Sequence, residues 1–373
     1  MSTALTDLGA ASVPHITHRL FDGRHIVFFS RDSADLPASL HDPRPGMERP
    51  GCGQLRQDPL TGDWIALATH RQNRTHLPPV DQCPLCPMQP GRETEIPTDF
   101  DVVAFENRFP ALGPGSVELP PPLTVPQPGT TYPAGGRCEV LVYTPEHHGS
   151  LAELAPERVQ LVLRALAQRT HALSQLPGIK QVFPFENRGE DIGTTLHHPH
   201  GQIYAYPYVT PTALKTAQRA AEYLETTGRT LHQDLLDMER ESGERMILSG
   251  DHASAYVPWA ARWPVEIHVV PHRHVPDLAA LTDAELDDLA AVLQDALTRV
   301  DALYSTPTPY IAAWHQAPLV DGLRAAARMH LQIMSPRRAQ HKLKYLAGSE
   351  AAMGAFIGDV SPEETAARLR SAL

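Results

Sequence analysis

The chain has 373 residues, of which 42% are apolar and 20% charged, an ordinary composition for a globular protein with a sizeable core. The formal net charge of −11 argues against a nucleic-acid-binding protein, because no basic surplus is present to neutralise a phosphate backbone. No segment approaches the roughly 20 apolar residues that cross a bilayer, and the N-terminus lacks the pattern of a secretory signal. Four cysteines do not make a disulfide scaffold in a chain of this length, so the expected location is the cytoplasm.

The first 50 residues are expected to form an N-terminal extension that includes one strand at Arg24–Phe29. A turn rich in Asp, Pro and Gly then predicts the start of a strand at Trp64–Ala68. Arg71 and Arg74 follow this strand. Two guanidinium groups there could clamp a phosphate, because guanidinium binds phosphate oxygens bidentately, although the pair alone is more typical of a solvated loop.

Cys83 and Cys86 form a C-x-x-C motif with three interpretations: half of a zinc site, a redox pair or a chance spacing. A redox pair normally opens a helix after a strand, whereas this motif lies among several prolines, which favours a metal-binding knuckle. Zinc prefers four nitrogen or sulfur ligands. Because Cys52 and Cys138 are isolated, two histidines must complete such a site.

The middle of the chain is predicted to contain two strands followed by a helix. Strands are predicted at Val102–Pro110 and Arg137–Tyr143, and the second is followed by His147 and His148. Apolar residues at helical spacing predict an amphipathic helix over Leu154–Leu176.

The most informative stretch is His198-Pro199-His200-Gly201-Gln202, which leads into a strand. Its two histidines project from the same side of an extended backbone, the proline stiffens them, and the glycine leaves room for a ligand. An isolated His-x-His is usually an ordinary part of a strand. Here Thr195 and its neighbours offer hydroxyl groups upstream, and an imidazole that faces a phosphate-sized gap indicates nucleophilic catalysis on phosphorus.

The second half of the chain repeats the order of elements in the first. A strand at Pro264–His274 precedes a helix at Asp283–Leu303, whose start has the capping-box residues Thr282 and Glu285. Another strand follows, and the copy ends in His-x-Gln-Ile at His330–Ile333. This repetition implies a duplicated α+β unit in which two antiparallel half-sheets join and helices cover one face.

The string H-P-H-G-Q, followed by an apolar and an aromatic residue, resembles the active-site signature of the galactose-1-phosphate uridylyltransferase family. This family is the transferase branch of the histidine-triad superfamily. The segments DPLTGDWIALATHRQNR and FENRFP resemble two further blocks of the family, in the same order. The resemblance implies an α+β fold of duplicated histidine-triad-like half-units with helices packed on an antiparallel sheet. It divides the chain into an extension (1–50), a half with the zinc and the nucleophile (51–215), and a C-terminal half (216–373).

The resemblance implies that the protein exchanges a uridylyl group between UDP-glucose and galactose 1-phosphate by a ping-pong mechanism. In this mechanism His200 becomes covalently uridylylated, assisted by Gln202, while its other ring nitrogen donates to a backbone carbonyl such as that of His198. The family is dimeric, so a homodimer is expected. The residues implied to bind substrate are Arg71, Arg74, Asn107, Asn187, Thr195, Lys344, Gly348 and Glu350.

The resemblance also implies that His147 and His198 complete a Cys₂His₂ zinc site with the C-x-x-C motif. His147 is preferred over the adjacent His148, which the sequence does not exclude. This zinc is expected to be structural and to brace the loop that carries the nucleophile.

Some members of the family hold a second metal, iron, with one glutamate and three histidines. His315 and His330 match two of these histidines, whereas Gln332 and Thr216 stand at the other two positions. The second metal site is therefore predicted to be absent or degraded.

Three other functions stay open. A nucleotide or nucleotide-sugar phosphorylase of the same superfamily would use the same histidine to transfer a nucleotidyl group to phosphate. A histidine-triad hydrolase typically carries His-x-His-x-His, so Gln202 at the third position favours transfer over hydrolysis. A zinc-stabilised binding module would bind a UDP-sugar without any exchange at His200.

Overall fold

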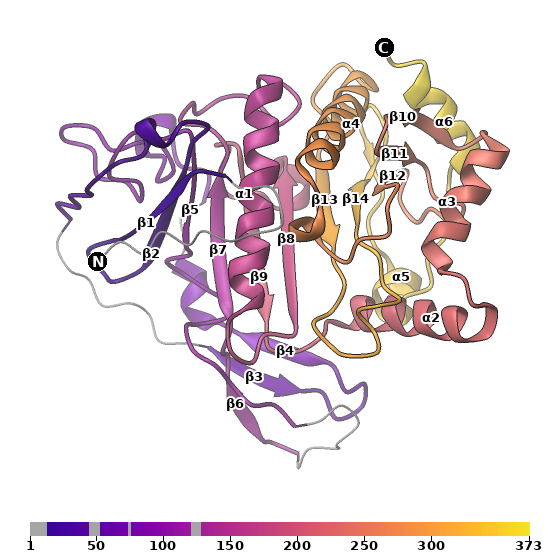
Figure 1. The fold of residues 1–373 in the computed structure, drawn as a ribbon, viewed down its shortest axis with the longest axis horizontal. Coiled ribbons are helices and arrows are strands. Elements are labelled where there is room, and N and C mark those ends of the chain that lie inside the picture. The colour runs from indigo at the N-terminus through magenta and orange to yellow at the C-terminus, as the bar shows by residue number, and fades with distance from the viewer. Residues whose placement is uncertain (1–12, 45–52, 74–75, 121–127) are drawn as a thin grey trace.

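The computed structural model describes residues 13–44, 53–73, 76–120 and 128–373. One 11-stranded sheet runs through these residues, and its neighbouring strands are antiparallel (Figure 1). From one edge to the other its strands are β1 (His15–Arg19), β2 (His25–Phe29), β5 (Val102–Glu106), β7 (Arg137–Val142), β9 (His200–Tyr206), β8 (Gln181–Arg188), β13 (Tyr310–His315), β14 (His330–Ser335), β12 (Val265–Pro271), β11 (Ala253–Tyr256) and β10 (Met246–Ser249).

The strand order confirms the duplicated α+β unit that the sequence predicts. The order β7-β9-β8 in the first half is mirrored by β13-β14-β12 in the second, so each strand of one copy has a counterpart in the other. The two copies join where β8 pairs with β13, with Arg188 opposite Tyr310 and Phe185 opposite Ala313. Each copy inserts one long helix after its first strand, α1 (Pro156–Ser174) and α4 (Asp283–Ala302).

The two long helices pack side by side across one face of the sheet (Figure 1). Leu163 of α1 and Leu293 of α4 belong to the same apolar core as Ile203 of β9 and Ile333 of β14. Burying each such side chain contributes about 1.5–3 kcal/mol. In β9, buried residues alternate with half-buried ones, beginning with a half-buried His200. The strand therefore turns its apolar side chains to the helices and its polar ones to the opposite face.

The predicted strand of the N-terminal extension is β2, and it belongs to the main sheet because it pairs with β5. The fully buried Arg24, just before it, donates to Asp22 at 2.6 Å and to the backbone carbonyl of Glu106 at 2.9 Å. A further bond to Glu95, at 2.5 Å, ties this edge to the loop that follows the C-x-x-C motif.

The remaining elements lie around this framework. A three-stranded sheet has the order β4 (Trp64–Leu67), β3 (Gln54–Gln57) and β6 (Thr131–Pro133), and a hairpin pairs β15 (Arg337–Ala339) with β16 (Lys342–Leu343). The other helices are α2 (Pro211–Thr227), α3 (Leu231–Ser242), α5 (Gly348–Met353) and α6 (Pro362–Arg370). Within the described part of the chain, every helix is too short or too polar to cross a membrane.

The capping box predicted at the start of α4 is confirmed. Glu285 accepts from the backbone N–H of Thr282 at 2.8 Å, and the Thr282 hydroxyl accepts from the backbone N–H of Glu285 at 3.4 Å. Arg273 donates to both carboxylate oxygens of Glu285, at 2.7 Å each. These hydrogen bonds from Arg273, with those of Thr282, lower the pKa of Glu285 to about 2.

Glu285→Gln should lower the free energy of unfolding by about 1–2 kcal/mol near neutral pH, because the cap and the charged pair are both weakened. The folded pKa of Glu285 is depressed, so its contribution is complete above the unfolded pKa of about 4.3 and is lost as the pH falls towards about 2. Urea denaturation should therefore show a difference in the free energy of unfolding between the two proteins that shrinks as the pH falls through this window. Glu157→Gln, at an exposed acidic position in the first turn of α1, is the control, and an equal loss there would contradict the assignment.

Candidate active site

His200 begins β9, on the face of the sheet opposite the long helices. Its Nδ1 lies 2.7 Å from the backbone carbonyl of His198, as the sequence analysis expected. A carbonyl oxygen only accepts, so Nδ1 carries the proton and Nε2 keeps a free lone pair in the neutral ring. Burial lowers the pKa of His200, which favours this neutral form.

A cleft of about 540 Å³ opens in front of the ring, a volume in the usual range for small-ligand sites. His200 lies in the wall of this cleft, together with Asn187, Thr194, His197 and His198. The structure thus brings Asn187, at the end of β8, to the same cleft as the nucleophile predicted on β9.

The threonine hydroxyl in this wall belongs to Thr194, the neighbour of the predicted Thr195. The side chain of Thr194 is buried, and its Oγ1 has no hydrogen-bond partner among the residues that the structure describes, as expected for a group that a ligand would satisfy. Thr195 instead accepts from the backbone N–H of Leu77 through its carbonyl, at 2.8 Å. The motif is compatible with a hydroxyl group at either Thr194 or Thr195, so the sequence alone does not distinguish the two residues.

Arg71 and Gln202 are connected through a residue that the sequence analysis missed. Arg71 lies in a short 3₁₀ helix (Thr69–Asn73) and donates to the Tyr204 hydroxyl at 3.3 Å. That hydroxyl donates to the side-chain carbonyl of Gln202 at 3.4 Å. Tyr204 could have been found by its spacing, because it lies two residues beyond Gln202 on the same face of the strand. The other predicted clamp residue, Arg74, lies outside the described residues.

Cys83, Cys86, His147 and His198 form a compact cluster whose ligand atoms all lie within 4.8 Å of one another. Nδ1 of His198 is 3.8 Å from the Cys83 sulfur and 3.5 Å from the Cys86 sulfur, and Nδ1 of His147 is 3.5 Å from the Cys86 sulfur. A tetrahedral zinc ion, with bonds of about 2.3 Å to sulfur and about 2.0 Å to nitrogen, requires ligand separations of this size.

The chemistry of the cluster fits a metal ion. Burial raises the pKa of the Cys83 thiol to about 11, so a thiolate there needs a cation beside it. Burial also lowers the pKa of His198 to about 4, and its Nε2 donates to the carbonyl of Thr144 at 2.8 Å, which leaves Nδ1 free to bind metal. His148 packs against the ring of His147 but lies outside the cluster.

The other predicted binding residues lie outside the wall of this cleft. Asn107 accepts from the backbone N–H of Phe109 at 2.8 Å, within its own turn. The Lys344 ammonium lies 3.6 Å from the Glu350 carboxylate, and Gly348 is the first residue of α5. Their contacts with substrate stay predictions.

Two of the four residues at the positions of the family's second metal site, His315 and Gln332, are hydrogen-bonded to each other. His315 donates from Nε2 to Gln332 at 2.9 Å, and Gln332 donates to Glu266 at 2.6 Å. The rings of His315 and His330 stack with their centroids 4.8 Å apart, and Thr216 lies in α2. The absence of a second metal stays a prediction.

Comparisons with known proteins identify the family of the chain. The family models for the N-terminal and C-terminal domains of galactose-1-phosphate uridyl transferase match residues 47–210 and 216–373. The chain is 41% identical over 369 residues to a galactose-1-phosphate uridylyltransferase of Streptomyces lividans, covering 94% of this chain and 96% of that one. It is 33% identical over 320 residues to a protein of the same name from Thermotoga maritima, covering 85% and 98%. A solved uridylyltransferase superposes with a TM-score of 0.76 at 33% identity, covering 86% and 98%. The chain therefore belongs to the galactose-1-phosphate uridylyltransferase family.

Proposed function

We propose that the protein exchanges the uridylyl group between UDP-glucose and galactose 1-phosphate through a covalent uridylyl–histidine on His200. The observation that carries this proposal is the 2.7 Å contact between Nδ1 of His200 and the His198 carbonyl in the wall of the cleft, because a carbonyl requires the proton on Nδ1 and so leaves the lone pair of Nε2 available as a nucleophile. Relatives named for the same activity support the substrates.

In the first step Nε2 of His200 attacks the α-phosphorus of UDP-glucose, and the bond from phosphorus to the oxygen of glucose 1-phosphate breaks. The positive charge that develops on the ring is stabilised by the hydrogen bond from Nδ1 to the carbonyl of His198. A phosphate oxygen of galactose 1-phosphate then attacks the same phosphorus, and the bond to Nε2 breaks. Splitting the exchange into two displacements is the advantage of covalent catalysis, and it predicts ping-pong kinetics.

The surrounding polar groups are suited to the charge on the phosphate oxygens. Hydrogen-bond donors are supplied by Asn187, by Gln202 and by Thr194 or Thr195. Positive charge is added by Arg71 and Arg74. Because the Gln202 carbonyl accepts from Tyr204, the amide NH₂ of Gln202 is left to donate to the substrate.

Zinc is the metal that the Cys₂His₂ cluster would hold, as a structural ion with a closed coordination sphere that braces the loop carrying His200. His198 connects the two sites, since its ring belongs to the cluster and its carbonyl accepts from His200. Lys344, Gly348, Glu350 and Asn107 are proposed to bind substrate by resemblance to the family, which also suggests a homodimer.

The direct test is to incubate the protein with UDP-glucose alone and to measure its intact mass. The expected result is an added uridylyl group on the protein and release of glucose 1-phosphate in equal amount. Parallel incubations with ADP-glucose and GDP-mannose distinguish a phosphorylase with another base preference. Binding of UDP-glucose with neither adduct nor released sugar phosphate would contradict the proposal and would favour a binding module.

Tyr204→Phe should slow the exchange by up to about tenfold, the scale of one neutral hydrogen bond, because Arg71 and Gln202 would lose the hydroxyl between them. Initial rates at saturating substrates would measure the effect. Tyr206→Phe is the matched control, since Tyr206 lies on the same face of β9 and one step further from Gln202. Equal rates for the two variants would contradict the role given to Tyr204.

A further inference from the structure

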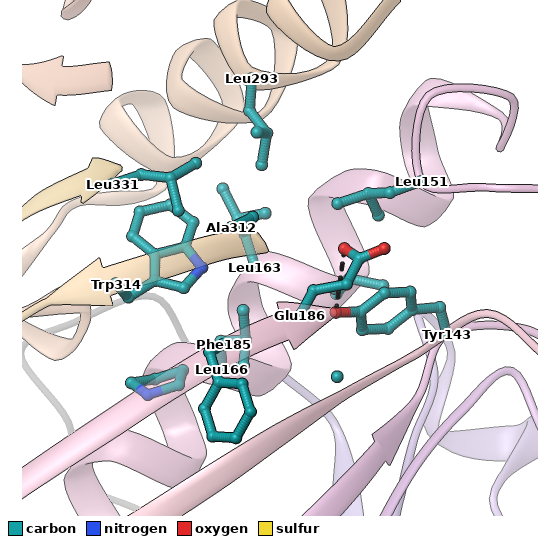
Figure 2. Close-up of a pocket in the computed structure, with 13 residues that line it drawn as sticks. Tyr143, Leu151, Leu163, Leu166, Phe185, Glu186, Leu293, Ala312, Trp314 and Leu331 are labelled. Atoms are coloured by element: carbon teal, nitrogen blue, oxygen red, sulfur yellow. Dashed lines mark hydrogen bonds between the residues drawn. The ribbon is translucent and has the colours of Figure 1, made fainter. Parts of the chain in front are cut away.

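A buried carboxyl group lies behind the strand that carries the nucleophile. Glu186 of β8 has one side-chain oxygen that accepts from the Tyr310 hydroxyl at 3.1 Å and another that accepts from the Tyr143 hydroxyl at 3.4 Å. Figure 2 shows the carboxyl group and Tyr143 facing each other beside a small internal cavity of about 20 Å³. Burial raises the pKa of Glu186 to about 7.

The surroundings of this carboxyl group are apolar, and among the described residues it has no ion-pair partner. Leu151, Leu293 and Trp314 line the same small cavity (Figure 2). The charged groups that act on Glu186 are Arg188 and Asp301, and these pair with each other at 2.6 Å. Removing a carboxylate from water costs several kcal/mol when no cation compensates it, so an apolar residue would stabilise this position more.

Tyr143 connects the carboxyl group to the nucleophile, because it contacts the residues on both sides of His200. Its backbone N–H donates to the carbonyl of Pro199 at 3.2 Å. On the other side its hydroxyl lies so close to the α-carbon of Gly201 that a methyl group added there would overlap it. The Tyr143 hydroxyl therefore occupies the space that a side chain at position 201 would fill. The hydrogen bond to Glu186 holds the hydroxyl in that place.

We propose that Glu186 and Tyr143 are positioning residues for His200. The carboxyl group fixes the Tyr143 hydroxyl against Gly201, and the Tyr143 backbone holds Pro199, so the intervening imidazole is held with Nε2 towards the cleft. This inference rests on the proposed function, since it concerns the residue that would carry the uridylyl group. Glu186 immediately precedes Asn187 in β8, and it lines both the small cavity and the cleft, so it lies between the apolar core and the active site.

Tyr143→Phe tests the proposal, with Tyr310→Phe as its matched control. Each variant removes one hydroxyl donor from the same carboxyl group, but Tyr310 lies opposite Arg188 in the neighbouring strand and not beside His200. The measurement is the single-turnover rate of uridylylation at saturating UDP-glucose, together with the Kd for UDP-glucose. Tyr143→Phe should lower the rate by about tenfold or more with little change in Kd, since a reacting group misplaced by about 1 Å can cost about 100-fold. Tyr310→Phe should lower it much less.

A second measurement does not depend on enzyme activity. The NMR signal of the Nδ1 proton of His200 should shift in Tyr143→Phe and stay in place in Tyr310→Phe. Glu186→Gln, which keeps one acceptor oxygen, should retain more of the rate than Glu186→Leu. Equal losses in Tyr143→Phe and Tyr310→Phe, or a weaker Kd with an unchanged rate, would overturn the proposal.

Gly201→Ala provides an independent check through a double-mutant cycle. Its loss of rate should be smaller in the Tyr143→Phe background, because the hydroxyl that overlaps the added methyl group is gone. Purely additive losses would overturn the proposed fit. If the unmodified protein forms no adduct, the proposed function fails, whereas an adduct with no difference between the two tyrosine variants refutes the positioning role alone.

Discussion

Replacing His200 with alanine should abolish sugar-phosphate exchange, with a fall of about 10⁴-fold or more in the rate, the scale expected when a covalent nucleophile is lost. The reason is that Nε2 of this ring is the atom proposed to bond to phosphorus, and alanine offers no substitute. The adduct seen by intact mass after incubation with UDP-glucose should disappear in the same variant.

His197→Ala is the matched control for this experiment. His197 lies in the wall of the same cleft, but its ring is half exposed and lies 3.4 Å from Glu190 at the surface. We expect this variant to form the adduct and to lose less than about tenfold in rate. If His200→Ala still formed the adduct and His197→Ala did not, His197 would be the nucleophile and the proposed mechanism would be refuted.

Cys83→Ser should abolish the zinc binding proposed for the cluster and lower the free energy of unfolding by more than about 4 kcal/mol, the range that accompanies loss of a structural metal. Serine cannot supply the thiolate that zinc requires, and the buried cluster would lose a ligand on the loop next to β9. Because the carbonyl of His198 orients His200, exchange activity should fall together with the zinc content.

Elemental analysis and urea denaturation would measure these effects, and Cys138→Ser is the control. Cys138 is equally buried but lies outside the cluster, and its sulfur accepts a weak hydrogen bond from the backbone N–H of Leu112 at 3.4 Å. We expect this variant to keep its zinc. An unmodified protein that purifies without stoichiometric metal and is fully active would contradict the role of the cluster.

The sequence predicts the elements whose signals are local. The capping box of Thr282 and Glu285, the apolar spacing of α1 and the alternation along β9 each depend on residues a few positions apart, and each is present in the structure. By contrast, β1 was not predicted, because it is a short segment with half-buried and exposed side chains that becomes a strand by pairing with β2. The helices α2 and α3 were not predicted either; both are amphipathic, but each buries only two residues, Ala217 and Ala220 in α2 and Leu236 and Glu239 in α3.

The candidate site is predictable only in part, for a similar reason. The C-x-x-C motif is visible from spacing, but its partners His147 and His198 are far apart in the sequence and are brought near each other by the pairing of β7 with β9, in which Val142 lies opposite His200. From the sequence, only the resemblance to the family identified these two histidines as ligands. Glu186 was overlooked because one acidic residue in a strand gives no sign that tertiary structure will bury it between two tyrosines.

The pairing of β8 with β13 gives the C-terminal copy a structural role in the half of the sheet that carries the nucleophile. Without the C-terminal copy, β8 would be an edge strand with unpaired backbone groups, open to association with other chains. The C-terminal copy therefore covers the open edge of the half-sheet that carries His200, a structural contribution that requires no chemistry at His330.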